Sequence, residues 1–144
     1  MLYDMRYIMK KILLSTLLLT SLLTGCSSSP KDAAALPSTW AVMAIDGHSE
    51  PVDALPKQPE LVIDNNLTVT YHGCNTLKGK LTLTGQNLLT KNLASTRKMC
   101  IQNEQAIVDG FVKRMLTGPS DYLVNQNTLI ISSERHTVTF KKVK

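Results

Sequence analysis

The sequence predicts an α+β domain built on a strongly curved antiparallel sheet or small open β-barrel of about eight short strands, with one amphipathic helix. Two observations lead to this class. Short segments of alternating apolar and polar residues recur along the chain between turn signals, whereas only residues 103–119 carry apolar side chains at helical spacing. Strands do not alternate with helices as they do in parallel sheets.

The N-terminus has the pattern of a secretory signal. Lys10-Lys11 precede the apolar run Ile12–Leu23, which is shorter than the roughly 20 residues that a membrane-spanning helix needs. The following residues complete the sequence Leu23-Thr24-Gly25-Cys26, which resembles a bacterial lipobox. We therefore expect residues 1–25 to be removed as a signal peptide and Cys26 to be acylated, which would attach the protein to a membrane.

The residues after Cys26 bear on location and domain organisation. In lipoproteins of this kind an aspartate after the cysteine resembles an inner-membrane retention signal, so Ser27 favours an outer-membrane anchor facing the periplasm. Residues 26–37 have few large apolar side chains and are predicted to form a flexible tether. Residues 38–144 then form one small domain with a single core.

Charge argues against a nucleic-acid partner. The net charge of +5 falls to +3 once residues 1–25 are removed, because they hold three basic residues and one acid. The remaining charges are scattered, and few aromatic side chains are available for stacking. We expect a monomer that uses no cofactor, binds no nucleic acid, and contacts the membrane through its lipid and an envelope protein or lipid-like ligand through its domain.

The first half of the domain reads as strands and turns. Residues Thr39–Asp46 predict the first strand, and a proline-containing loop over 48–59 follows it. Residues 59–64 and Leu67–Tyr71 predict a hairpin whose turn, Asp64-Asn65-Asn66, supplies residues suited to positive φ. Residues 80–85 and 86–96 predict the next two strands, and residues 121–143 predict three more at the end of the chain.

Residues 103–119 predict the helix, with Asn103 as its N-cap and Gly118-Pro119 at its end. Asp109 stands four residues before Lys113, which suits an exposed ion pair. We expect the apolar stripe to cover the sheet, and a partner-binding face is the alternative. The stripe consists of Ile107, Val108, Phe111, Val112, Met115 and Leu116.

Three cysteines leave one pair once Cys26 is assigned to lipid. Cys74 and Cys100 are predicted to form a disulfide in an oxidising compartment, and two reduced, buried thiols are the alternative. A Cys74 nucleophile would need His72 or His136 as its base. A zinc site would combine His72, Cys74, Cys100 and a second histidine, but the paired spacing usual for zinc ligands is absent. We therefore expect no catalytic residues and no metal site.

Several motifs resemble the META domain family. They are Trp40 followed by Gly47, the triplet Gly73-Cys74-Asn75, and the segment Thr96-x-x-Met99-Cys100 before a helix. Among members of that family, the chain resembles heat-shock lipoproteins of the enterobacterial envelope. The resemblance implies a small β-rich domain with a helix, a link to envelope stress and to tolerance of antibiotics such as novobiocin, and no established enzymatic activity.

The residues and the resemblance together favour a non-catalytic envelope lipoprotein that binds a protein or a lipid-like molecule and supports stress or antibiotic tolerance. The first alternative is a carrier that holds an acyl chain or other small ligand in an apolar cleft of the curved sheet. The second is a hydrolase or redox enzyme that uses Cys74 with His72. A packed core would argue against the carrier, and a free Cys74 thiol is a requirement of the enzyme.

Overall fold

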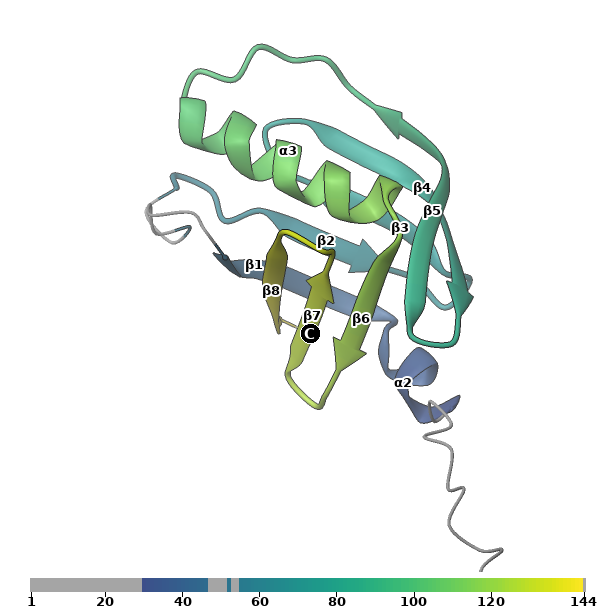
Figure 1. Ribbon diagram of the computed structural model, residues 1–144. Helices are drawn as coiled ribbons and strands as arrows, with labels where there is room; N and C mark the ends of the chain where they lie inside the picture. Colours follow the sequence, from purple (N-terminus) through teal and green to yellow (C-terminus); the bar gives the residue numbers. More distant parts are fainter. Residues whose placement is uncertain (1–29, 47–51, 53–54, 144) are drawn as a thin grey trace, which may run out of the picture.

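The computed structural model describes residues 30–46, 52 and 55–143, and its elements are shown in Figure 1. The expected signal peptide, Cys26 and Gly47 lie outside the described residues. Within them, no helix is both long enough and apolar enough to cross a bilayer.

Eight antiparallel strands form a barrel in which each strand pairs with the next and β8 pairs with β1. The predicted class, a curved antiparallel sheet with an amphipathic helix, is confirmed, but the barrel is closed rather than open. The last strand returns to the first, an arrangement that local sequence patterns do not reveal. The strands are β1 Ser38–Ile45, β2 Glu60–Ile63, β3 Thr68–His72, β4 Thr76–Thr84, β5 Asn87–Ser95, β6 Ser120–Val124, β7 Thr128–Ser132 and β8 Thr137–Lys142.

One seam of the barrel is short. Strand β5 pairs with β6 only through Asn87 opposite Asp121 and Leu88 opposite Ser120. The rest of β5 continues without β6 as a partner, and helix α3 (Asn103–Thr117) packs against it. Figure 1 shows α3 lying across one end of the barrel, between the end of β5 and the start of β6. The helix therefore closes the region that strand pairing leaves open.

The predicted apolar stripe of α3 covers the sheet, since Val108, Val112, Met115 and Leu116 are buried. Two predicted members of the stripe lie nearer its border. Ile107 is 42% exposed, and Phe111 is half-buried with its ring against that of His136. The predicted N-cap is wrong by one residue, because Gln102 occupies that position in an extended conformation without a side-chain cap bond.

The barrel interior is filled by side chains. Eight of them have no exposed surface, and the buried face of α3 packs against the same cluster. These eight residues are Trp40, Val42, Leu61, Val69, Tyr71, Leu129, Val138 and Phe140. Buried side chains of the sheet and of the helix thus form one contiguous core cluster.

Two further local expectations differ from the structure. Part of the predicted flexible tether forms the short helix α2 (Pro30–Ala35), and Leu36 after it is buried and accepts a hydrogen bond from the Trp40 indole N–H (2.9 Å). In the β2–β3 turn the residue with positive φ is Leu67, at 59°, and neither asparagine. The Asp64 carboxylate accepts hydrogen bonds from the backbone N–H groups of Asn66 and Thr68, which fixes that turn.

Candidate functional site

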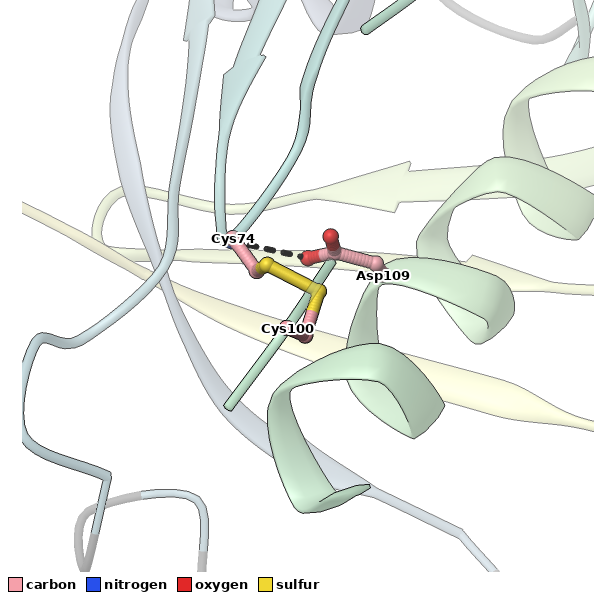
Figure 2. Close-up of side chains that lie close together, drawn as sticks. All are labelled: Cys74, Cys100 and Asp109. Carbon is pink, nitrogen blue, oxygen red and sulfur yellow. Dashed lines mark hydrogen bonds between the residues drawn. A yellow bond between two sulfur atoms is a disulfide. The ribbon is translucent and has the colours of Figure 1, made fainter. Parts of the chain in front are cut away.

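The family-like motifs gather at the end of the barrel where α3 begins. Residues Gly73–Asn75 form the connection between β3 and β4, and Cys100 lies in the connection between β5 and α3. Cys74 and Cys100 form a disulfide with an S–S distance of 2.03 Å and a Cα–Cα distance of 5.9 Å. Figure 2 shows this disulfide beside the carboxylate of Asp109, which α3 contributes.

Asp109 is a buried carboxylate that holds the β3–β4 connection. Its side chain is 7% exposed. One carboxylate oxygen accepts hydrogen bonds from the Tyr71 hydroxyl (3.0 Å) and the Cys74 N–H (3.2 Å), and the other accepts one from the Asn75 N–H (2.6 Å). Hydrogen bonds to a charged group are stronger than neutral ones, so Asp109 ties α3 to the barrel. The expected exposed pair with Lys113 is therefore wrong.

Tyr71 is the donor in this cluster because its hydroxyl remains protonated. Burial raises the pKa of Tyr71 well above its usual value of 10.0, and the negative charge of Asp109 raises it further. A protonated phenol next to a carboxylate must donate its hydrogen. The pair thus places a hydrogen-bonded charge between the sheet and the helix without exposing either group.

Gly73 is required by the close approach of Asp109 and Tyr71. A Cβ atom at Gly73 would lie 2.0 Å from the Asp109 carboxylate oxygen and 2.5 Å from the Tyr71 hydroxyl oxygen. Contacts that short are not tolerated, so any larger residue would displace the cluster. The first residue of the Gly-Cys-Asn triplet therefore leaves space for the carboxylate.

Asn75 and Thr96 connect the same triplet to the segment after β5. The Asn75 side-chain oxygen accepts hydrogen bonds from the Lys98 N–H (2.8 Å) and the Thr96 hydroxyl (3.0 Å). Thr96 in turn accepts one from the Thr76 N–H (3.0 Å). The Asn75 amide nitrogen lies 3.6 Å from the Cys100 sulfur. The β3–β4 and β5–α3 connections are thus joined by hydrogen bonds as well as by the disulfide.

The β5–α3 connection presents two large apolar side chains to solvent. Met99 is 95% exposed and Ile101 is 99% exposed, on either side of the half-buried Cys100. Arg97 and Lys98, which are also exposed, precede them. We call residues Arg97–Ile101 the apical segment. Its backbone is held by the disulfide and by Asn75, so its exposed side chains are displayed from a fixed base.

The structure does not bring the two candidate histidines to the cysteines. Among the described residues, the group of metal-ligating side chains is Cys74, Cys100 and Asp109, with ligand atoms within 4.8 Å of one another. His72 is exposed at the end of β3, and His136 packs against Phe111. In the disulfide neither sulfur is a free thiolate, so this form has no cysteine nucleophile at the site.

Two surface depressions lie near α3. A groove of about 1070 Å³ runs along the short seam and has Leu88, Leu89 and Met115 among its lining residues. A smaller depression of about 400 Å³, lined in part by Arg97, Asp109 and Lys113, lies beside the apical segment.

Asp109 is the site residue that sequence reasoning missed. The sequence does contain an indication that Asp109 is buried. Val112 and Leu116 follow Asp109 by three and seven residues, so all three share one helical face. A carboxylate on the buried face of a helix needs donors. The donors come from a segment 34 to 38 residues away, which the sequence does not show to be adjacent.

The fold of this chain has counterparts among known proteins. The family model of the META domain matches residues 34–144, and the chain belongs to the META domain family. The chain is 26% identical over 123 residues to heat shock protein HslJ of Escherichia coli strain K12. The aligned residues cover 83% of this chain and 86% of HslJ. The resemblance seen in the sequence is confirmed.

Two solved structures share the fold. One protein studied by NMR has a TM-score of 0.65 and 23% sequence identity, over 74% of this chain and 90% of its own. A second NMR structure, of a protein from Burkholderia xenovorans, has a TM-score of 0.63 and 20% identity, over 78% and 88% of the two chains. The barrel with its covering helix is thus a shared architecture.

Proposed function

We propose that this META-domain protein is a non-catalytic, lipid-anchored component of the bacterial envelope that binds a partner polypeptide through the apical segment and supports tolerance of envelope stress. The observation that carries the proposal is the display of Met99 and Ile101, almost fully exposed, from a connection fastened by a disulfide. Because the backbone that carries them is already fastened, binding costs little entropy of loop ordering, so these large apolar side chains are effective anchors for a partner.

Charge supports the kind of partner. Arg97 and Lys98 precede the two apolar side chains, and Lys113 lines the adjoining depression with Arg97. A partner surface with an apolar pocket bordered by acidic side chains complements this arrangement. The packed interior argues for recognition on the outside of the barrel rather than within it.

The position of the apical segment also fits a protein partner better than the anchoring membrane. Figure 1 shows α2, which follows the proposed anchor at Cys26, at the opposite end of the barrel from the β5–α3 connection. Anchored through Cys26, the domain would direct the apical segment away from its own membrane. A disulfide is favoured in the periplasm, which agrees with the proposed location.

A complementation experiment tests the proposal. In a strain lacking the protein, the wild-type gene is expected to restore growth under detergent and antibiotic stress, whereas Met99→Ser combined with Ile101→Ser fails. The matched control is Met43→Ser combined with Leu123→Ser, because these side chains are also exposed, at 46% and 52%, but lie elsewhere. Cys26→Ser is expected to fail through loss of the anchor.

Full restoration by the Met99/Ile101 variant at equal protein level would contradict the proposed contact. Binding of the purified full chain to anionic phospholipid vesicles, lost in the same variant, would instead assign the segment to a lipid surface. A turnover by the purified protein that Cys74→Ser abolishes would contradict the non-catalytic role.

The groove along the short seam supports a second candidate function, the binding of a lipid-like ligand. Leu88, Leu89 and Met115 are among its lining residues, and Arg114 and Arg135 also line it. Apolar surface beside cations suits a molecule with an acyl chain and an acidic head. Saturable binding of a fluorescent fatty acid that Leu89→Asp abolishes, with Leu123→Asp as the control, would favour this candidate.

A further inference from the structure

We propose that the reduced form of the protein binds one thiophilic divalent cation, of the Zn²⁺ or Cd²⁺ class, through the sulfurs of Cys74 and Cys100 and one carboxylate oxygen of Asp109. These ligand atoms already lie within 4.8 Å of one another, as Figure 2 illustrates. The site uses Cys100 of the apical segment but neither Met99 nor Ile101, the side chains that carry the proposed function, so either proposal can fail without the other.

The backbone requires little adjustment for such a site. Two thiolates on one tetrahedral zinc ion lie roughly 3.7 Å apart, as follows from Zn–S bonds of about 2.3 Å. The Cα atoms of Cys74 and Cys100 lie 5.9 Å apart, so rotation of the two side chains suffices to bring their sulfurs to this separation. Cys74 and Cys100 are both half-buried, so a fourth position is open to water.

The carboxylate of Asp109 retains capacity for a cation. An ionised carboxylate offers about four lone-pair positions, and three hydrogen bonds from Tyr71, Cys74 and Asn75 are directed at Asp109. These donors orient the carboxylate as outer-shell groups orient metal ligands in other proteins. The Asn75 amide nitrogen, 3.6 Å from the Cys100 sulfur and 4.0 Å from that of Cys74, is placed to donate to both sulfurs.

The charges explain why reduction would favour a cation. A dithiol reductant transfers two electrons and two protons to the disulfide, giving two thiols, and is itself oxidised to a disulfide. When the cation binds, the two thiols release their protons to solvent and form two metal–sulfur bonds. In the bound state two thiolates and one carboxylate lie within one small volume, and the cation between them offsets their mutual repulsion.

A bound cation would replace the disulfide as the link between the two connections. Cys74 lies between β3 and β4 and Cys100 precedes α3, so a cation shared by them would tie the same segments. The apical segment would then keep its attachment in a reducing environment as well as in an oxidising one. The protein would have two exchangeable fasteners at one position.

The experiment uses the full chain in detergent, with Cys26→Ser in every sample so that Cys74 and Cys100 are the only cysteines. The protein is reduced anaerobically with a phosphine and titrated with Cd²⁺, and the thiolate-to-cadmium absorption in the ultraviolet is recorded. We expect one cation per chain, a higher melting temperature of the reduced protein when Cd²⁺ is present, and no binding by the oxidised protein. Zn²⁺ affinity is then measured by competition with a chelator.

Asp109→Asn is expected to weaken binding by at least about tenfold, since even outer-shell substitutions cost roughly 10- to 100-fold. Glu104→Gln is the matched control, because it removes one negative charge from the first turn of α3 outside the cluster. X-ray absorption of the zinc-bound, reduced chain carrying native Asp109 gives a second measurement that does not depend on whether Asp109→Asn folds. Two sulfur and at least two light-atom ligands are expected.

The proposal is overturned if the oxidised protein binds equally well, or if folded Asp109→Asn keeps its full affinity. Coordination by sulfur alone or one cation shared by two chains would also contradict it. If Asp109→Asn does not fold, the ligand set found by X-ray absorption decides.

Discussion

Replacement of Gly73 by alanine should destabilise the protein strongly, because the new Cβ would lie 2.0 Å from the Asp109 carboxylate and 2.5 Å from the Tyr71 hydroxyl. Neither atom belongs to a flexible surface side chain. Asp109 is 7% exposed and Tyr71 has no exposed surface, so each has little room to move. The carboxylate must shift by about 1 Å or more to restore an ordinary contact, at the expense of the hydrogen bonds it accepts.

The magnitude follows from two contributions. Overpacking of a core costs typically about 1–3 kcal/mol, and loss of one hydrogen bond to a charged group costs about 1.5–3 kcal/mol. We expect Gly73→Ala to lower the free energy of unfolding by about 3–5 kcal/mol. With an m-value of about 2 kcal/mol/M, the urea midpoint falls by roughly 2 M.

Gly110→Ala is the matched control in the same assay, equilibrium urea unfolding of the oxidised protein followed by circular dichroism. Gly110 lies inside α3 with open space around its Cβ position, where only the Arg114 guanidinium comes within 3.9 Å. Alanine there should raise the stability by up to about 1 kcal/mol. Equal midpoints for Gly73→Ala and the wild type would refute the close approach of Asp109 to the β3–β4 connection.

Three further outcomes are expected from the same unfolding assay. Reduction of the Cys74–Cys100 disulfide in the absence of metal ions should lower stability by about 3–4 kcal/mol, from the entropy of the 26-residue separation; an unchanged midpoint would contradict its role as a fastener. Because the pKa of Tyr71 is raised on folding, its contribution to the free energy of unfolding is full below pH 10 and is lost as the pH rises from 10 toward the folded pKa. The stability of the wild type should therefore fall more steeply above pH 10 than that of Tyr71→Phe. Parallel curves for the two proteins would be inconsistent with a buried phenol. The hydrogen bond from the Thr68 N–H is the main cause that lowers the pKa of Asp64 in the folded protein. The contribution of Asp64 to the free energy of unfolding is therefore present above about pH 3.8 and is lost as the pH falls through the lower folded pKa. Asp64→Ala should therefore show a shallower loss of stability in acid, and identical acid profiles would argue against the turn.

The elements of this fold could be predicted from the sequence because their signals are local. Alternation placed most of the strands, and the 3.6-residue stripe placed α3 to within its last residues. Closure of the barrel requires β1 to pair with β8, for example Trp40 with Lys142, although these strands lie at opposite ends of the domain's sequence. No short pattern encodes such a pairing, so the sequence indicated curvature but not closure.

The sequence predicted the cysteine pair and the motif residues of the candidate site, but not the buried carboxylate of Asp109 that joins them. Gly73, Asn75 and Thr96 stood out only as motif residues, because their partners lie in other segments. The spacing of Asp109 fits an exposed ion pair with Lys113 as well as it fits a buried carboxylate on the apolar face. Only the tertiary contact with Tyr71 distinguishes these two interpretations. The turn residue Leu67 was missed since intrinsic preference favours asparagine at positive φ.

The two-residue pairing of β5 with β6 makes this seam the place where the barrel opens most readily. If the contact at Asn87 and Leu88 opens, the closed cylinder becomes a sheet with two bare edges, and such edges are templates for aggregation. The Tyr122 N–H bond to the Gln86 carbonyl, the side-chain hydrogen bond from Asn87 to Asp121 and the packing of α3 on β5 oppose this opening. Amide hydrogen exchange should therefore be fastest, among the core strands, along the side of β6 that faces β5.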